Sequence, residues 1–153
     1  MAEVNLIGVI TMEENIVDGH IVSFKFHVHR LDFMQRTFYP LLYCTLCPTI
    51  KTMWEIELKY ERVSHDNDSY TFSITLKRKD SSSHLVKASL FATFYDAHGN
   101  SPVCPIASDR GKMVLDDELQ GTLDNIRSAE LSEVVAVRIT IIIENCHSGT
   151  FFF

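Results

Sequence analysis

Two histidines at alternate positions, His27 and His29, are the residues whose type and spacing most readily suggest chemistry. Residues 24–33 read FKFHVHRLDF, in which apolar and polar side chains alternate. In a strand that turns Phe24 toward the core, both histidines lie on the outer face and can reach a single metal ion. Metal enzymes use this spacing on strands, so a metal site is one interpretation of the segment.

The other interpretation is a strand with two histidines that face solvent, and the sequence favours it. A metal site needs three or four ligands, and the remaining ones would have to come from Glu55 or Glu57 on another strand. The ammonium group of Lys25, beside the histidines, would repel a cation. We therefore expect no metal and no cofactor, and retain a small β-sandwich metalloenzyme using His27 and His29 as an alternative.

The four cysteines, Cys44, Cys47, Cys104 and Cys146, give a weaker signal. Cys44 and Cys47 form a CxxC motif, but a structural zinc site would need a second pair of ligands, and the candidates are distant in the chain. A redox CxxC usually begins a helix, whereas this one follows a strand-like segment. No secretory signal is evident, so we expect reduced thiols and a cytoplasmic or nuclear protein.

Two charged runs are interpreted as solvated surface. The acidic run at 116–118 and the basic run at 77–79 both fall where turns or strand ends are expected. The sequence shows no phosphate-binding glycine loop, no nucleophile elbow and no helical zinc-protease motif. We therefore predict a protein that is not an enzyme and has no catalytic residues.

Composition limits the classes of partner. The 153 residues fit a single domain, and 46% of them are hydrophobic, which suffices for a core. The formal net charge of −6 argues against nucleic-acid binding, which needs a basic face. No apolar run approaches the roughly 20 residues of a membrane-spanning helix. We expect neither nucleic acid nor membrane as a partner.

Alternation of apolar and polar residues with period two predicts strands along most of the chain. The strongest patterns predict strands at 22–31, 52–61, 69–76, 86–96 and 134–143, and weaker ones predict short strands near 4–10 and 37–43. One short helix is expected within 115–130, where Gly121 interrupts the pattern. These elements predict an all-β fold, an antiparallel β-sandwich. We expect an N-terminal extension with an extra strand at 1–21, the sandwich domain at 22–144 and an irregular tail at 145–153.

The order of several landmarks resembles that of MATH (TRAF-homology) domains. These landmarks are the strand FKFHVHRL at 24–31, YPLLY at 39–43, MWEIEL at 53–58, YTFSITL at 70–76, the long strand and glycine turn at 86–99, and the closing strand at 131–143. The likeness covers roughly residues 22–144 and is greatest to the MATH domains of speckle-type POZ (MATH-BTB) proteins.

The resemblance implies a substrate adaptor that binds short extended peptides of client proteins. It implies a groove built from strands 70–76 and 86–96 and the loop 108–113, with the peptide-binding residues Ile74, Leu90, Gly111, Lys112 and Met113. Ile74 and Leu90 occupy positions that are usually aromatic, which implies a more aliphatic peptide or a lost client specificity.

We expect three kinds of partner. Client peptides or proteins are the first, and a second copy in a homo-oligomer is the second. Components of a cullin ubiquitin ligase are the third, and they would be reached only through a BTB domain, which these 153 residues do not include. A scaffold sandwich without a client peptide remains an alternative function, beside the peptide adaptor and the metalloenzyme.

Overall fold

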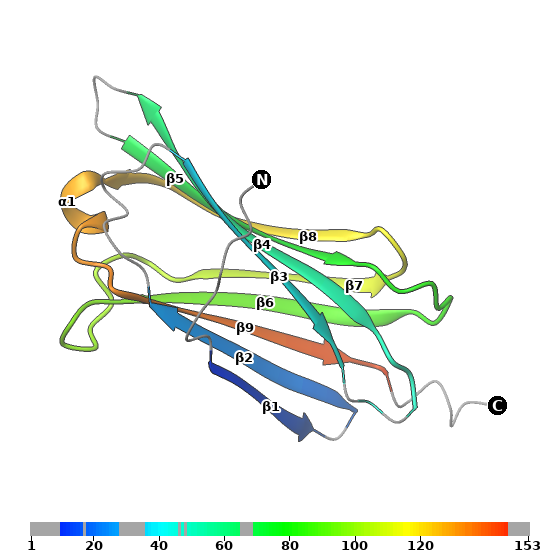
Figure 1. Cartoon of the computed structure of the whole chain (residues 1–153). Coiled ribbons are helices and arrows are strands. Elements are labelled where there is room, and N and C mark those ends of the chain that lie inside the picture. Colours follow the sequence, from blue (N-terminus) through cyan, green and yellow to red (C-terminus); the bar gives the residue numbers. More distant parts are fainter. Residues whose placement is uncertain are drawn as a thin grey trace.

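The computed structural model describes residues 10–16, 18–27, 36–45, 47, 49–64 and 69–146. In this part of the chain, nine strands form two antiparallel sheets that pack as two layers (Figure 1). The strands are β1 (Ile10–Ile16), β2 (Gly19–His27), β3 (Arg36–Cys44), β4 (Met53–Ser64), β5 (Ser69–Arg78), β6 (Val86–Tyr95), β7 (Ile106–Met113), β8 (Glu118–Arg127) and β9 (Ala136–Glu144). The predicted all-β sandwich is confirmed.

The two sheets divide the strands unequally. The five-stranded sheet has the order β1-β2-β9-β6-β7, and the four-stranded sheet has the order β3-β4-β5-β8. Every neighbouring pair is antiparallel. Each sheet therefore has one face toward the core and one face toward solvent, which is the arrangement that period-two alternation predicts.

The core lies between the two layers and is built from the apolar members of the alternating strands. In β5, Tyr70, Phe72, Ile74 and Leu76 are all at most 1% exposed. Phe72 meets Phe94 of the opposite layer with their ring centroids 4.7 Å apart. Burying each such side chain contributes roughly 1.5–3 kcal/mol to the free energy of unfolding.

Two segments differ from the sequence prediction. Residues 108–113, expected as a loop, belong to β7, and most of the segment expected to hold a helix forms β8. The helix α1 is the single turn Ser128–Leu131. Strand β8 was missed because the middle inward position of its alternating series is Gly121, where Ile106 packs into the space a side chain would fill.

The sandwich also extends beyond its predicted boundaries. Strand β1 pairs with β2 along its length, so residues 10–16 and 19–21 belong to the five-stranded sheet. Gly19 is required at this start, because a Cβ built there would lie 2.0 Å from the carbonyl oxygen of Ile143. Of the short strand expected near 4–10, only Ile10 falls among the described residues, and 147–153 of the expected tail lie outside them.

The basic run at 77–79 holds a buried arginine, contrary to its interpretation as solvated surface. The Arg78 side chain is fully buried. Its Nη1 donates to the carbonyl oxygen of His84 at 2.6 Å and also to that of Met113, while its Nε and Nη2 donate to the Asp80 carboxylate. Arg78 therefore fastens the end of β5 to the end of β7 and to the 80–85 segment.

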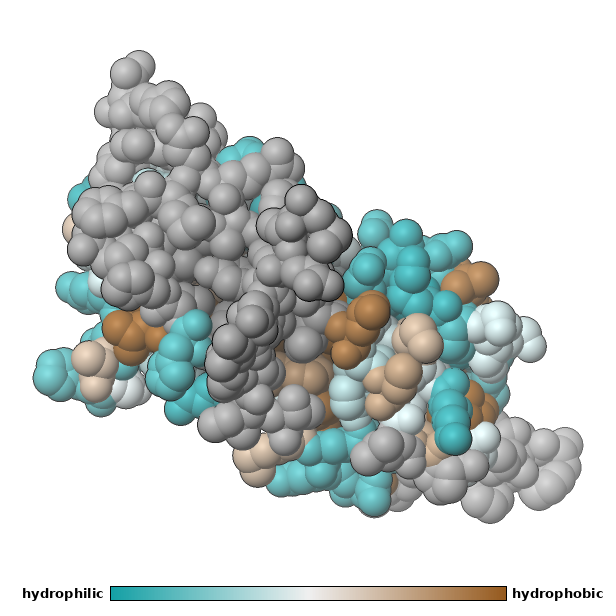
Figure 2. Space-filling view, in the orientation of Figure 1, coloured by the Kyte–Doolittle hydropathy of each residue, from teal (hydrophilic) through white to brown (hydrophobic). Residues whose placement is uncertain are grey.

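No helix in the described ranges combines the length and apolar character needed to cross a bilayer. On the face shown in Figure 2, hydrophobic residues among the described ones are interspersed with hydrophilic residues.

Candidate functional site

Three of the five predicted peptide-binding residues lie in the core. Ile74, Leu90 and Met113 are each 0% exposed. Their strands also belong to different layers, since β5 lies in the four-stranded sheet and β6 in the five-stranded sheet. Ile74 and Leu90 therefore approach the core from opposite sides and do not line a common groove, which corrects the placement that the resemblance implied.

The other two predicted residues, Gly111 and Lys112, are exposed near the end of β7. Lys112 has a positive φ of 58°, in the left-handed region, beside an irregularity in the β6–β7 register between Val86 and Ala88. Among the described residues, no carboxylate lies within 4.0 Å of the Lys112 ammonium. Its charge is therefore free to meet an anionic group of a ligand.

Strand β7 is an edge of the five-stranded sheet. Among the strands of the described chain it pairs only with β6. Between Ile106 and Met113, which are buried, its residues are exposed or half-buried. An edge strand of eight residues presents unpaired main-chain groups, and natural proteins usually protect such edges with charged side chains. Asp109, Arg110 and Lys112 fit that protective role.

A shallow hollow adjoins this edge on the outer face of the five-stranded sheet. It is lined by Ser89, Phe91, Ala107, Ser108 and Asp109. Phe91 is 40% exposed although it lies in a central part of β6, and it sits directly opposite Ala107 in the β6–β7 register. An exposed aromatic ring beside a small residue leaves apolar surface uncovered. We call the hollow lined by these five residues the β6–β7 hollow.

Phe91 does not stand out in the sequence, because an apolar residue at this outward position makes β6 look buried on both faces. The outward series of β6 places Phe91 between Ser89 and Thr93, and the inward series consists of Val86, Ala88, Leu90, Ala92 and Phe94. The signal that could have found Phe91 is a large aromatic side chain in an otherwise polar outward series, since such positions normally hold solvent-compatible residues.

A second hollow on the same outer face has a basic lining. Lys25, His27, Tyr95, Asp96 and Arg138 are among its residues. Lys25 stands directly opposite Arg138 in the β2–β9 register, and its ammonium lies 5.8 Å from the Tyr95 ring centroid. Like charges placed opposite each other are unfavourable, so this pair would gain from an anion. The second hollow is separated from β7 by the width of β6.

The metalloenzyme alternative receives no support from the geometry. His27 is exposed on the outer face of β2, as predicted, and His29 lies outside the described residues. Glu55 and Glu57 belong to β4 in the four-stranded sheet and alternate there with the buried Trp54, Ile56 and Leu58. Their side chains are therefore on the outer face of that sheet, on the far side of the core from His27. These two carboxylates and His27 therefore cannot share one ion.

Comparison with known proteins supplies no family. The chain matches no protein-family model, and no curated protein matches it significantly.

Proposed function

We propose that this protein is a non-enzymatic, MATH-like interaction domain that binds an extended peptide of a client protein along strand β7. The observation that supports the proposal most strongly is the juxtaposition of an edge strand with the β6–β7 hollow. An added peptide strand would find main-chain partners on β7 and an apolar contact on Phe91 within the same few residues.

Strand addition explains why both features are needed. Main-chain hydrogen bonds between the peptide and an edge strand contribute affinity with little dependence on sequence. Specificity then comes from pockets that receive alternate side chains of the peptide. The β6–β7 hollow would receive one apolar side chain, and Ser89, which lines it, would donate or accept a hydrogen bond with a neighbouring hydroxyl group of the peptide.

The positive charge of Lys112 favours peptides that carry an acidic residue. Its exposed ammonium lies on the same strand as the lining residues Ala107 and Asp109. A carboxylate on the peptide toward the Met113 end of β7 would form an ion pair with it, whereas a basic residue there would be repelled. The preferred ligand is therefore an extended peptide with an apolar anchor followed or preceded by an acidic residue.

The resemblance to speckle-type POZ proteins extends the proposal to biology. A domain that captures client peptides would act as a substrate adaptor for cullin-dependent ubiquitination when it is joined, in the same chain or through a partner, to a BTB domain. Self-association through β7 is the competing use of the same edge, because a second copy could add its own β7 as the next strand.

The test is binding of the purified domain to an array of short serine- and threonine-rich peptides with varied apolar and acidic positions. We expect saturable binding that Phe91→Ser and Lys112→Glu each weaken by about tenfold or more, a loss of roughly 1.4 kcal/mol. Leu42→Ser is the matched control for Phe91, because Leu42 is 67% exposed on the other sheet. Arg138→Glu is the matched control for Lys112, because Arg138 is an exposed cation on β9, and β6 separates β9 from β7.

Peptide chemistry separates strand addition from contact with the sheet face. Methylating alternate peptide amides removes the donors that would bond to β7, so one methylation register should abolish binding and the other should leave it intact. Binding that ignores both registers, or that survives Phe91→Ser and Lys112→Glu, would contradict the proposal. An absence of any peptide binding in a monomeric, folded sample would leave the scaffold alternative.

A further inference from the structure

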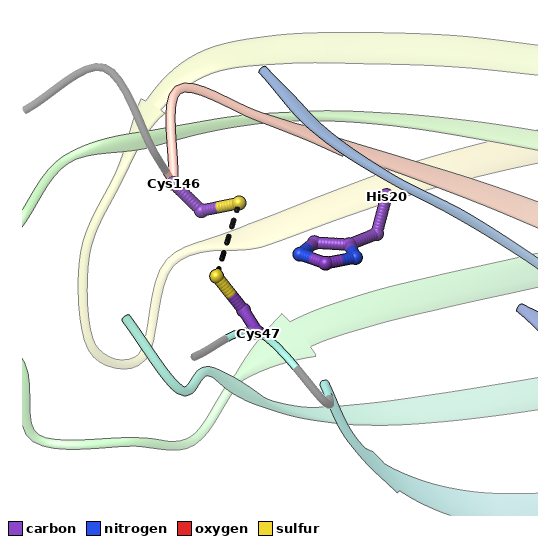
Figure 3. A group of neighbouring side chains, drawn as sticks. All are labelled: His20, Cys47 and Cys146. Atoms are coloured by element: carbon purple, nitrogen blue, oxygen red, sulfur yellow. Dashed lines mark hydrogen bonds between the residues drawn. The ribbon is translucent and has the colours of Figure 1, made fainter. Parts of the chain in front are cut away.

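Three buried side chains with metal-binding atoms meet at one end of the sandwich. They are His20 of β2, Cys47 of the loop between β3 and β4, and Cys146 just after β9. Each is at most 1% exposed, and their ligand atoms all lie within 4.8 Å of one another. In Figure 3 the Nε2 side of the His20 ring is turned toward the two sulfur atoms.

The loop that carries Cys47 is closed by hydrogen bonds. The backbone nitrogen of Thr45 donates to the carbonyl oxygen of Thr52 at 2.9 Å, and the backbone nitrogen of Thr52 donates to Thr45 Oγ1 at 3.0 Å. Trp54 Nε1 donates to Thr52 Oγ1 at 2.8 Å. The two ends of the loop that carries Cys47 are thereby joined by hydrogen bonds.

The position of Cys146 is fixed in a similar way from the other sheet. The backbone nitrogen of Asn145 donates to the carbonyl oxygen of Asp18 at 2.9 Å, and His84 Nε2 lies 2.8 Å from the carbonyl oxygen of Asn145. Asn145 has a positive φ of 68°, which turns the chain inward directly before Cys146. The thiol is consequently held in the core even though it follows the last strand.

We propose that His20, Cys47 and Cys146 form a binding site for a zinc-class metal ion that joins the two sheets. The two sulfur atoms are 3.8 Å apart. Two thiolates that each lie ~2.3 Å from a tetrahedral zinc ion are separated by about 3.8 Å. A disulfide would require about 2.05 Å instead, so the observed spacing fits joint coordination of one ion. The fourth tetrahedral position is left to a water molecule.

The surroundings of the three ligands suit a cation. Glu13 Oε2 lies 3.8 Å from His20 Nδ1, on the side of the ring opposite the sulfur atoms. Metal-bound histidines usually direct their second nitrogen to a carboxylate or carbonyl, which orients the ring and strengthens the ligand. Glu13 Oε1 is buried and has no hydrogen-bond partner among the described residues, so this carboxylate keeps a free acceptor.

Metal binding would change the protonation of the site. Burial, reinforced by the neighbouring Cys47 thiol and by the charge of Asp18, raises the pKa of Cys146 to about 12. Coordination replaces the S–H protons of Cys47 and Cys146 by bonds to the ion and releases both protons to solvent, while His20 binds as the neutral imidazole.

The site has a structural consequence that is independent of peptide binding. Its ligands come from β2 and the end of β9 in one layer and from the β3–β4 loop in the other. The described residues show no disulfide that joins the two layers. The bound ion would therefore cross-link the two sheets through its coordination bonds. Binding to the native state alone would raise the stability of the protein by mass action.

The test uses the full chain, purified in reductant and freed of metal by chelation. Titration with Co²⁺ is expected to give a thiolate-to-cobalt charge-transfer band that saturates at one equivalent and disappears on addition of Zn²⁺. The band should be lost in Cys47→Ser and Cys146→Ser and weakened in His20→Ala. Cys44→Ser and Cys104→Ser are the matched controls, because both cysteines are exposed, and they should retain it in full.

A measurement on the unsubstituted chain guards against variants that fail to fold. Zn²⁺ should raise the midpoint of thermal unfolding, and in mild denaturant it should slow alkylation of Cys47 and Cys146 but not of Cys44 or Cys104. A reduced, folded chain with no charge-transfer band and no zinc-dependent thermal shift would overturn the site. So would a band that is lost in the Cys44 variant and kept in the Cys146 variant.

Discussion

The guanidinium of Arg78 donates two hydrogen bonds to the carboxylate of Asp80, from Nε to Oδ2 at 2.9 Å and from Nη2 to Oδ1 at 3.0 Å. Two parallel charge-assisted bonds are the strongest form of this pairing. Because Arg78 is fully buried, its charge has no access to water and depends on this carboxylate together with two backbone carbonyls.

Removing the carboxylate should be costly. We expect Asp80→Ala to lower the free energy of unfolding by roughly 3–5 kcal/mol, because a buried guanidinium is left without its counter-ion. Urea denaturation measures the loss. The control is Glu144→Ala, whose side chain is 38% exposed and whose carboxylate lies 3.9 Å from the Lys87 ammonium. An exposed ion pair contributes about 0–1 kcal/mol. Equal losses in the two variants would contradict the role assigned to Arg78.

The same pair predicts a dependence of stability on pH. Burial alone would raise the pKa of Asp80, but hydrogen bonds from Arg78 and Met53 and the charge of Arg78 hold the pKa below its ordinary value. In the unfolded chain Asp80 takes up its proton near the ordinary value of about 3.9, so as the pH falls the unfolded state binds protons first. The contribution to stability is present above that pH and is lost as the pH falls through the folded-state pKa.

Thermal unfolding of the wild type and of Asp80→Asn, measured as the pH is lowered through the ordinary pKa of an aspartate, checks the direction of this pH dependence. The wild type should lose stability on acidification more steeply than the variant, and the gap between them should narrow at low pH. A gap that widens as the pH falls would show that the carboxyl is protonated in the native state.

Glycine at position 19 should be obligatory for the start of the five-stranded sheet. A Cβ there would meet the Ile143 backbone, which cannot rotate away, so Gly19→Ala should cost roughly 1–3 kcal/mol of stability. Gly111→Ala is the matched control, because nothing lies within 4 Å of a Cβ at that position. Chemical denaturation should show the control near the wild-type value, and a tolerated Gly19→Ala would contradict the close approach.

Two consecutive residues of β6 should respond in opposite ways. Leu90→Ala should lower the free energy of unfolding by roughly 2–5 kcal/mol, because Leu90 lies in the core. Phe91→Ala should change stability little and should instead weaken peptide binding, because its ring is exposed at the β6–β7 hollow. Paired denaturation and binding curves separate the two effects. A stable Leu90 variant with weakened binding would return Leu90 to the binding surface.

The fold was predictable where one face of a strand is buried and the other is wet. Tyr70–Leu76 and the Trp54 strand show that pattern, and β5 and β4 follow it closely. Strand β7 was not predictable in the same way, because as an edge strand it is exposed or half-buried from Ala107 to Lys112 and its sequence does not alternate. Alternation of apolar and polar residues arises because one face of a strand is buried, so a strand that buries few side chains does not show the pattern.

The candidate sites were less predictable than the fold. Ile74 and Leu90 were assigned to a groove by resemblance, although their own period-two patterns place them inside. Cys47 and Cys146 are 99 residues apart, and only the packing of the two sheets brings their thiols together. The partners of Arg78 are likewise distant carbonyls, which carry no signal in the sequence.

Trp54 gives this molecule a built-in optical probe. It is the single tryptophan of the chain, it is fully buried, and its indole nitrogen donates to Thr52 at the closure of the loop that carries Cys47. Its fluorescence therefore comes from one known place, at the junction of the two layers. A red shift of the emission on unfolding, or a change on addition of a metal, would report on that end of the sandwich without any label.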